Sequence, residues 1–264
     1  MGVAPARSIP LLTRLRRFLR AKLLGLLSRL ASLLPLRVAL GLGALGGRLA
    51  FLFARRQRGL ALAHLAIAFP ERTQAERLAL ARACFSNLGR MALELTQLRK
   101  IDRRLDRYVY WPSEDIAALR GAVYPGEGGL FITGHIGNWE LLARRIVAEG
   151  FDHLVVGRTP GDAGLAALLQ RLRAGGGVHT VDRSALSARR EILVALKRGA
   201  LLGILIDQDT RVQGSFVPFF GRPAHTPRAA EDLARRLGMP VFVGFIHRRP
   251  DGGHELRTEM ASPA

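Results

Sequence analysis

Residues suited to proton transfer gather in the stretch 129–140, where an apolar run is followed by glycines and then by a helix start. Residues 130–132 have the bounded apolar pattern of a buried strand, and Asn138 is a good helix N-cap. His135 is therefore expected just beyond the carboxyl end of a strand and beside a helix N terminus. Open α/β sheets build their sites at such places.

Four residues separate His135 from Glu140, and the turn between them lets the carboxylate fold back toward the imidazole. Such a carboxylate would fix the tautomer of the ring and stabilise the imidazolium. The stretch holds no Ser or Cys nucleophile, so the pair indicates a general base that activates a hydroxyl directly, with helix N–H groups to stabilise an oxyanion. The alternative interpretation is a structural strand-end histidine and a structural helix-start acid.

Two further segments place charged residues after predicted strands. Arg158 follows a strand predicted over 151–156 and should lie at the same sheet edge as the histidine, where it could hold a phosphate or an oxyanion. Asp207 and Asp209 follow a strand predicted over 201–206. Without a neighbouring His or a third acid, a metal site is the weaker interpretation. We predict that Asp207 positions the substrate or supports the site.

The stretch Gly-His-Ile-Gly-Asn-Trp-Glu at 134–140 resembles the His-x4-acid block of the glycerolipid-type acyltransferases. More narrowly, it resembles that of the lipid A late acyltransferases, which are lauroyl and myristoyl transferases. The resemblance runs from about Arg58 to Arg248. Its other segments are Asn87-Leu88-Gly89 with Glu94, Arg158-Thr159-Pro160, Asp207-Gln208-Asp209 and residues 216–224.

This resemblance implies a fatty acyl thioester on acyl carrier protein as donor and a hydroxyl of a lipid A precursor, an anionic glycolipid, as acceptor. His135 would be the general base and Glu140 its partner, with Asn138, Arg158 and Asp207 as candidate substrate-binding residues. No metal or redox cofactor is implied. One alternative is a phosphatidylinositol mannoside or other glycolipid acyltransferase that uses acyl-CoA. Another is a basic membrane-surface or nucleic-acid-binding protein without enzymatic activity.

Positive charge is concentrated at the start of the chain. The net charge is +19 over 264 residues, and residues 1–60 contribute +12 because they hold twelve Lys or Arg and no acid. Only 6% of the residues are aromatic, and no nucleic-acid-binding motif is recognisable, which argues against nucleic acid as a partner. The single Cys84 excludes an intramolecular disulfide and is typical of a reducing compartment.

The N-terminal segment has the pattern of a membrane-associated region. Over 11–30, leucines recur at helical spacing opposite arginines, as in a helix that lies in a membrane interface, although packing on the protein's own domain is an alternative. Residues 30–53 are apolar but interrupted by Pro35 and by arginines, which favours a short apolar hairpin over a membrane span. We expect residues 1–54 to bind membrane lipids at the cytoplasmic face of the bacterial inner membrane.

The remaining residues, 55–264, are predicted to form one α/β acyltransferase domain. Residues 55–120 have helical patterns, and the later strands alternate with helices of 10–15 residues, which predicts a mostly parallel sheet covered by helices. Glu94 belongs to a segment that resembles the family, but it could equally be a solvent-exposed charge on a helix. The aromatic stretch 216–220 fits core packing and an acyl-chain groove equally well.

Overall fold

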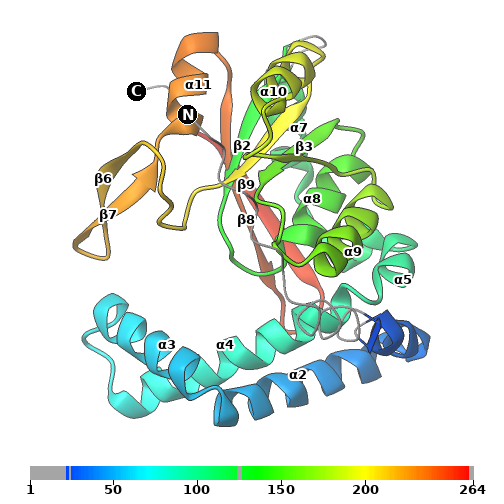
Figure 1. Cartoon of the computed structure of the whole chain (residues 1–264), viewed down its shortest axis with the longest axis vertical. Coiled ribbons are helices and arrows are strands. Elements are labelled where there is room, and N and C mark those ends of the chain that lie inside the picture. The colour runs from blue at the N-terminus through cyan, green and yellow to red at the C-terminus, as the bar shows by residue number, and fades with distance from the viewer. Residues whose placement is uncertain (1–21, 24, 124–126, 262–264) are drawn as a thin grey trace, which may run out of the picture.

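The protein consists of an α/β unit and a layer of long helices that lies against one end of it (Figure 1). The computed structural model describes residues 22–23, 25–123 and 127–261. The α/β unit contains the central sheet. The helical layer, made of α2, α3 and α4, lies across one end of that sheet.

The central sheet has seven strands in the order β1-β9-β8-β2-β5-β3-β4. The five strands from β8 to β4 are parallel, whereas β9 is antiparallel to β8. This confirms the predicted mostly parallel sheet. The strands are β1 (Val109–Tyr110), β2 (Gly129–Thr133), β3 (His153–Gly157), β4 (His179–Asp182), β5 (Leu201–Leu205), β8 (Val241–Arg248) and β9 (His254–Met260).

Helices cover both faces of the sheet, and successive side chains of the central strands enter different cores. Phe131 and Leu201 belong to a core with α7 and α8, while their neighbours Leu130 and Leu202 belong to a core with α10 and α11. Strands buried on both faces explain the continuous apolar runs of the sequence. The helices of this unit are α5 (Leu98–Asp102), α6 (Leu105–Tyr108), α7 (Ser113–Ala122), α8 (Trp139–Ala148), α9 (Ala163–Ala174), α10 (Ala188–Lys197) and α11 (Ala229–Leu237).

The helical layer is held together by glycines that let two backbones touch. Its members are α2 (Leu36–Phe53), α3 (Arg55–Ala68) and α4 (Gln74–Glu94). A Cβ atom on Gly43 would lie 2.5 Å from the carbonyl oxygen of Gly89, and one on Gly47 would overlap the backbone of Phe85. Only glycine permits this approach, so α2 and α4 form one closely packed pair.

The apolar hairpin predicted within residues 30–53 is wrong. Pro35 separates the helical residues 25–33 from α2, and α2 then continues without a turn to Phe53. By length and composition α2 could cross a membrane. It packs against α4 with its glycine side and exposes Leu42, Leu45 and Leu49 on the outside. Most of the amphipathic helix predicted over 11–30 lies outside the described residues; residues 25–33 are helical.

An antiparallel hairpin, β6 (Gly214–Phe219) and β7 (Arg222–Pro227), projects from the α/β unit (Figure 1). Its two-residue turn has positive φ at Phe220 (47°) and Gly221 (69°). Phe216 and Phe219 are exposed, so core packing is wrong for this aromatic stretch. The ring of Phe220 meets that of Phe69, the residue that follows α3, with 5.8 Å between the ring centroids.

Candidate active site

His135 lies where the sequence predicts it, in the short loop between β2 and α8. The loop turns at Gly137, whose φ is +62° and whose missing Cβ makes room for the carbonyl oxygen of Ile246. Only glycine fits there without strain. The His135 side chain is 33% exposed, so a substrate can reach the imidazole. The edge of the ring meets Trp139, with ring centroids 4.8 Å apart.

Asp207 is the carboxylate that binds His135. It follows β5, which pairs with β2 through Thr133 and Leu205, so the two loops leave the sheet side by side. Asp207 Oδ2 accepts the backbone N–H of His135 at 2.6 Å, and Oδ1 lies 2.8 Å from the ring Nδ1. An ionised carboxylate can only accept, so this contact places the proton on Nδ1 and leaves the lone pair on Nε2.

Gly134 leaves room for the close approach of Asp207. A Cβ atom at this position would lie 3.0 Å from Asp207 Oδ2, which is tighter than ordinary van der Waals contact. The absence of a side chain at Gly134 therefore leaves space for the Asp207 carboxylate, which follows the neighbouring strand β5. Sequence reasoning identified His135 and Asp207 but did not join them. It predicted that Asp207 positions the substrate or supports the site, and it assigned Glu140 as the partner of His135.

Glu140 does not bind His135, so the predicted contact is wrong. Its carboxylate is held by Arg173 of α9, with Arg173 Nε at 2.9 Å from Oε2 and Nη2 at 2.6 Å from Oε1. Only 11% of the Glu140 side chain is exposed. The hydrogen bonds with Glu140 raise the pKa of Arg173 above its usual value, despite partial burial. In the first turn of α8, Glu140 points across to the neighbouring helix, and this pair joins the start of α8 to the end of α9.

Asn138 has no exposed surface and works as the N-cap of α8. Its Oδ1 accepts the backbone N–H of Leu141 at 3.3 Å, and its Nδ2 donates to Glu94 Oε2 at 2.9 Å. Both polar atoms of the side chain are thus engaged within the protein. The predicted contact of Asn138 with substrate is wrong for this conformation, since the amide faces the interior.

Glu94 is fully buried and collects hydrogen bonds from four side chains, so it is not the solvated charge that the sequence left open. Arg248 donates to both carboxylate oxygens at 2.8 and 2.9 Å, Tyr108 donates at 2.5 Å, and His254 Nε2 lies at 3.0 Å. Burial alone would raise the pKa of Glu94. The hydrogen bonds from His254 and Arg248 outweigh burial and hold this pKa at about 2. Through Asn138, this cluster fixes the start of α8.

Neither Arg158 nor Asp209 forms a hydrogen bond or ion pair with His135. Arg158 follows β3 at the predicted edge of the sheet, but β5 separates β3 from β2. Its side chain is exposed, and it forms no hydrogen bond or ion pair with any residue that the structure describes. Asp209 pairs with His225 of the β6–β7 hairpin at 3.0 Å. Within the described ranges, no group of three or more His, Cys, Asp or Glu residues could hold a metal ion.

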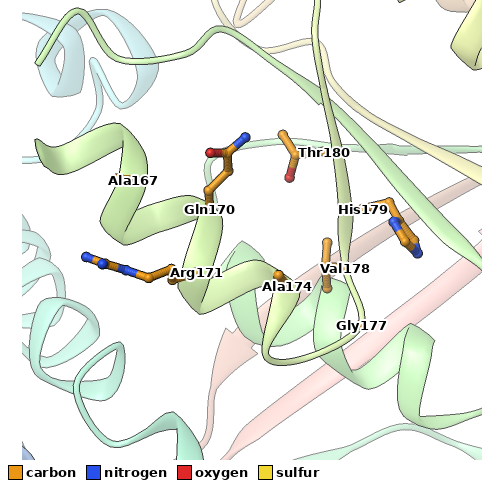
Figure 2. A pocket seen from close by; sticks show the side chains of 8 residues that line it. All are labelled: Ala167, Gln170, Arg171, Ala174, Gly177, Val178, His179 and Thr180. Atoms are coloured by element: carbon orange, nitrogen blue, oxygen red, sulfur yellow. The ribbon is translucent and has the colours of Figure 1, made fainter. Parts of the chain in front are cut away.

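A hollow of about 490 Å³ lies between α9 and the edge strand β4 (Figure 2). Gln170 and Thr180 project toward the same space, whereas Arg171 and His179 point away from it. Small residues and backbone form much of the remaining wall. The hollow therefore offers no converging charge, and the histidine–carboxylate pair beside β2 is the better candidate for chemistry.

Sequence reasoning missed Arg173 and three partners of Glu94, which are Tyr108, Arg248 and His254, and it left the role of Glu94 open. Arg173 lies on a helix already rich in arginines, so its type alone carries no signal. Glu94 could have been suspected because it is the last residue of α4 amid apolar neighbours.

A model of the bacterial lipid A biosynthesis acyltransferases matches residues 10–263. No curated protein matches the chain. The family match spans the β2–α8 loop, the segment after β5 and the helical layer, so it includes every residue of the arrangement described above.

Proposed function

This chain belongs to the bacterial lipid A biosynthesis acyltransferase family, and from that membership we propose a specific reaction for it. The protein is an acyltransferase that acts in lipid A biosynthesis, which sets aside the interpretation as a non-enzymatic protein. We propose that it transfers a fatty acyl group from acyl carrier protein to a hydroxyl of a lipid A precursor. We further propose His135 as the general base.

The observation that carries the mechanism is the pair of contacts between Asp207 and His135. With Nδ1 held at 2.8 Å by the carboxylate, Nε2 is free to take a proton from the acceptor hydroxyl. Asp207 stabilises the imidazolium that results, as an acid partner does in other histidine-based sites. General-base assistance of this kind typically contributes about 10²–10⁴ in rate.

The transfer then proceeds through a tetrahedral intermediate. The acceptor oxygen attacks the carbonyl carbon of the thioester, and N–H groups at the start of α8 or the Arg158 guanidinium stabilise the oxyanion. The C–S bond breaks, the ester forms, and the departing thiolate takes the proton from His135. The products are the acylated lipid and the free thiol of the carrier.

Glu140 and Asn138 support this reaction without contacting the reacting atoms. Glu140 is bound to Arg173, and Asn138 is bound to Glu94, so both fix the position of α8 directly after the histidine. We propose them as positioning residues. Their loss would lower turnover by displacing the imidazole relative to the thioester, since small displacements of reacting groups are costly.

Residues 1–54 are proposed as the membrane-associated segment, at the cytoplasmic face of the inner membrane. Support comes from the exposed leucines of α2 and from the charge of +12 on residues 1–60, because cationic segments are attracted to anionic leaflets. The exposed Phe216 and Phe219 of the hairpin are proposed to contact the acyl chain of a substrate.

The test is acyl transfer from labelled acyl carrier protein to a purified lipid A precursor. His135→Ala is expected to lower turnover at least about a hundredfold, given the usual contribution of a general base. His179→Ala is the matched control, because His179 is an exposed histidine on the edge strand β4. Near-normal turnover in His135→Ala would reject the mechanism.

Donor and acceptor are tested separately. Acyl-CoA offered in place of acyl carrier protein, and a phosphatidylinositol mannoside offered in place of the lipid A precursor, distinguish the alternative reaction. Mass spectrometry of the product reports the acceptor and the length of the added chain together. Transfer only from acyl-CoA would contradict acyl carrier protein as the donor, and transfer only to the mannoside would contradict the lipid A precursor as the acceptor. Neither result would contradict the role of His135 as the general base.

A further inference from the structure

A cavity of about 910 Å³ lies between α2 and α4, and Arg248 at the end of β8 contributes to its wall. No Asp or Glu lines it, although four arginines do. The residues that line the cavity are Arg48, Phe51, Leu52, Leu80, Arg82, Ala83, Cys84, Ser86, Asn87, Arg90 and Arg248.

Three of the four arginines carry uncompensated positive charge. Arg248 is neutralised by the buried Glu94 and also donates to Asn87 at 2.8 Å. By contrast, Arg48, Arg82 and Arg90 form no hydrogen bond or ion pair with any residue in the described part of the chain. Like charges that line one cavity repel one another, and an anion that enters the cavity relieves this repulsion while it accepts charge-assisted hydrogen bonds.

Apolar side chains also line the cavity, namely Phe51, Leu52 and Leu80. Arg82 lies over the Phe51 ring, with 5.7 Å between the guanidinium carbon and the ring centroid. Leu52 is also exposed beside the outward leucines of α2. A cavity that is lined by both arginines and apolar side chains, one of them the exposed Leu52, matches a molecule that carries a phosphate on a hydrocarbon chain.

We propose that this cavity binds the phosphate of an anionic membrane lipid. Arg48, Arg82 and Arg90 bind the phosphate oxygens, and an acyl chain lies along Phe51 and Leu52. The proposal stands on the cavity alone and does not depend on the proposed acyl transfer. Binding is therefore measured in the His135→Ala background, where no turnover is expected.

The probe is dihexanoyl phosphatidic acid, titrated by calorimetry into the full chain in a non-ionic detergent. Replacing Arg48, Arg82 and Arg90 together by Gln is expected to weaken binding at least about tenfold, because charge-assisted hydrogen bonds to phosphate are lost. The matched control replaces Arg189, Arg190 and Arg198 by Gln. These are exposed arginines at α10, and the change in net charge is the same. The control should bind within about twofold of the parent chain.

Cys84 supplies a second readout that needs no added label. It is the only cysteine of the chain, it is exposed, and it lines the cavity. Dihexanoyl phosphatidic acid should slow the reaction of Cys84 with a maleimide several-fold in the parent chain and in the Arg189, Arg190 and Arg198 control. It should leave the rate unchanged in the Arg48, Arg82 and Arg90 variant. Equal melting temperatures of the two triple variants establish that folding is not the cause.

The outcomes separate the alternatives. Equal weakening in both triple variants means that net charge alone attracts the lipid, and overturns the site. Inorganic phosphate that binds as tightly as the lipid probe makes this a site for a soluble anion, and overturns the lipid assignment. Dihexanoyl glycerol that binds as tightly as the phosphatidic acid overturns the role of the arginines.

Discussion

The Asp207 carboxylate holds His135 at two points, the backbone N–H at 2.6 Å and the ring Nδ1 at 2.8 Å. One contact fixes the loop and the other fixes the ring. The two residues are 72 positions apart in the chain and meet because β5 lies next to β2. A carboxylate held this way sets both the position and the tautomer of the proposed base.

Replacing Asp207 by Asn should lower kcat for acyl transfer at least about a hundredfold, because an amide in that position can stabilise the wrong tautomer of His135 and cannot stabilise an imidazolium. Steady-state kinetics with acyl carrier protein as donor measure this change. Asp209→Asn is the matched control, since its partner is His225. Equal kinetics of Asp207→Asn and the parent chain would refute the role of Asp207.

Gly134→Ala should lower kcat at least about tenfold with little change in the melting temperature. The added Cβ would lie 3.0 Å from Asp207 Oδ2 and push the carboxylate away from the imidazole. Gly121→Ala, where a Cβ meets nothing within 4 Å, should be neutral in kcat. The same kinetic assay compares the two, and a Gly134→Ala enzyme as fast as the control would count against the close approach of Asp207.

Glu140 and Arg173 should behave as one unit in a double-mutant cycle. Glu140→Ala and Arg173→Ala are each expected to lower kcat about tenfold or more, and the double variant should be no slower than the worse single variant. A Glu140 that acted directly on His135 would give a different pattern, because Arg173→Ala would then retain most of its activity. The cycle therefore distinguishes support of α8 from direct contact with the base.

Glu94→Gln should lower the free energy of unfolding by about 3–5 kcal/mol, because it leaves the buried Arg248 without its counter-charge. In the parent chain, Glu94 has a folded-state pKa of about 2, below its ordinary 4.5. Its contribution is therefore fully present above pH 4.5 and is lost as the pH falls toward 2. Urea unfolding in detergent between pH 6 and pH 3 measures the loss of unfolding free energy in Glu94→Gln and the pH dependence of stability in the parent chain. Glu191→Gln, on the exposed face of α10, should change neither.

His153 should make the protein less stable in mild acid. Burial lowers the pKa of His153 to about 4 from 6.5, so below pH 6.5 the unfolded chain binds a proton that the folded chain does not. Stability then falls as the pH drops from 6.5 to 4, by about 3 kcal/mol in all, since a pKa difference of one unit corresponds to about 1.4 kcal/mol.

The check is the slope of the unfolding free energy against pH in His153→Leu. Leucine is close to histidine in volume and cannot be protonated, so the fall between pH 6.5 and pH 4 should disappear. An unchanged slope in His153→Leu would assign the acid sensitivity to another group. Glu94 acts at lower pH, and the two windows meet only near pH 4.

The sequence predicted the parallel core of the fold because β2, β3, β5 and β8 contain apolar runs. It missed β6 and β7, where Pro218 and Pro223 stand opposite each other in the ladder, since proline weakens any strand pattern. It also missed β9, an antiparallel strand in which Glu255, Arg257 and Glu259 alternate with less polar residues. Such a strand lacks the apolar run by which the parallel strands were recognised.

The site was predictable as far as the position of His135, but its partner was not. Glu140 is close to His135 in the sequence, and the turn between them was expected to bring the two side chains together. The prediction of their contact depended on that expectation. The order of the strands, which no local pattern contains, instead places Asp207 beside the ring. Glu140 is drawn to Arg173, which is 33 positions later and lies on α9.

The contact between the α2 and α4 backbones at Gly43 and Gly89 has a mechanical consequence. Because α4 ends at Glu94, which is bonded to Asn138 beside the histidine loop, a continuous series of contacts connects the helix that carries the outer leucines to the loop that carries the imidazole. A bilayer that meets those leucines would then find the reactive nitrogen at a fixed height. The enzyme, and not the thickness of the leaflet, would determine how far an acceptor must rise to be acylated.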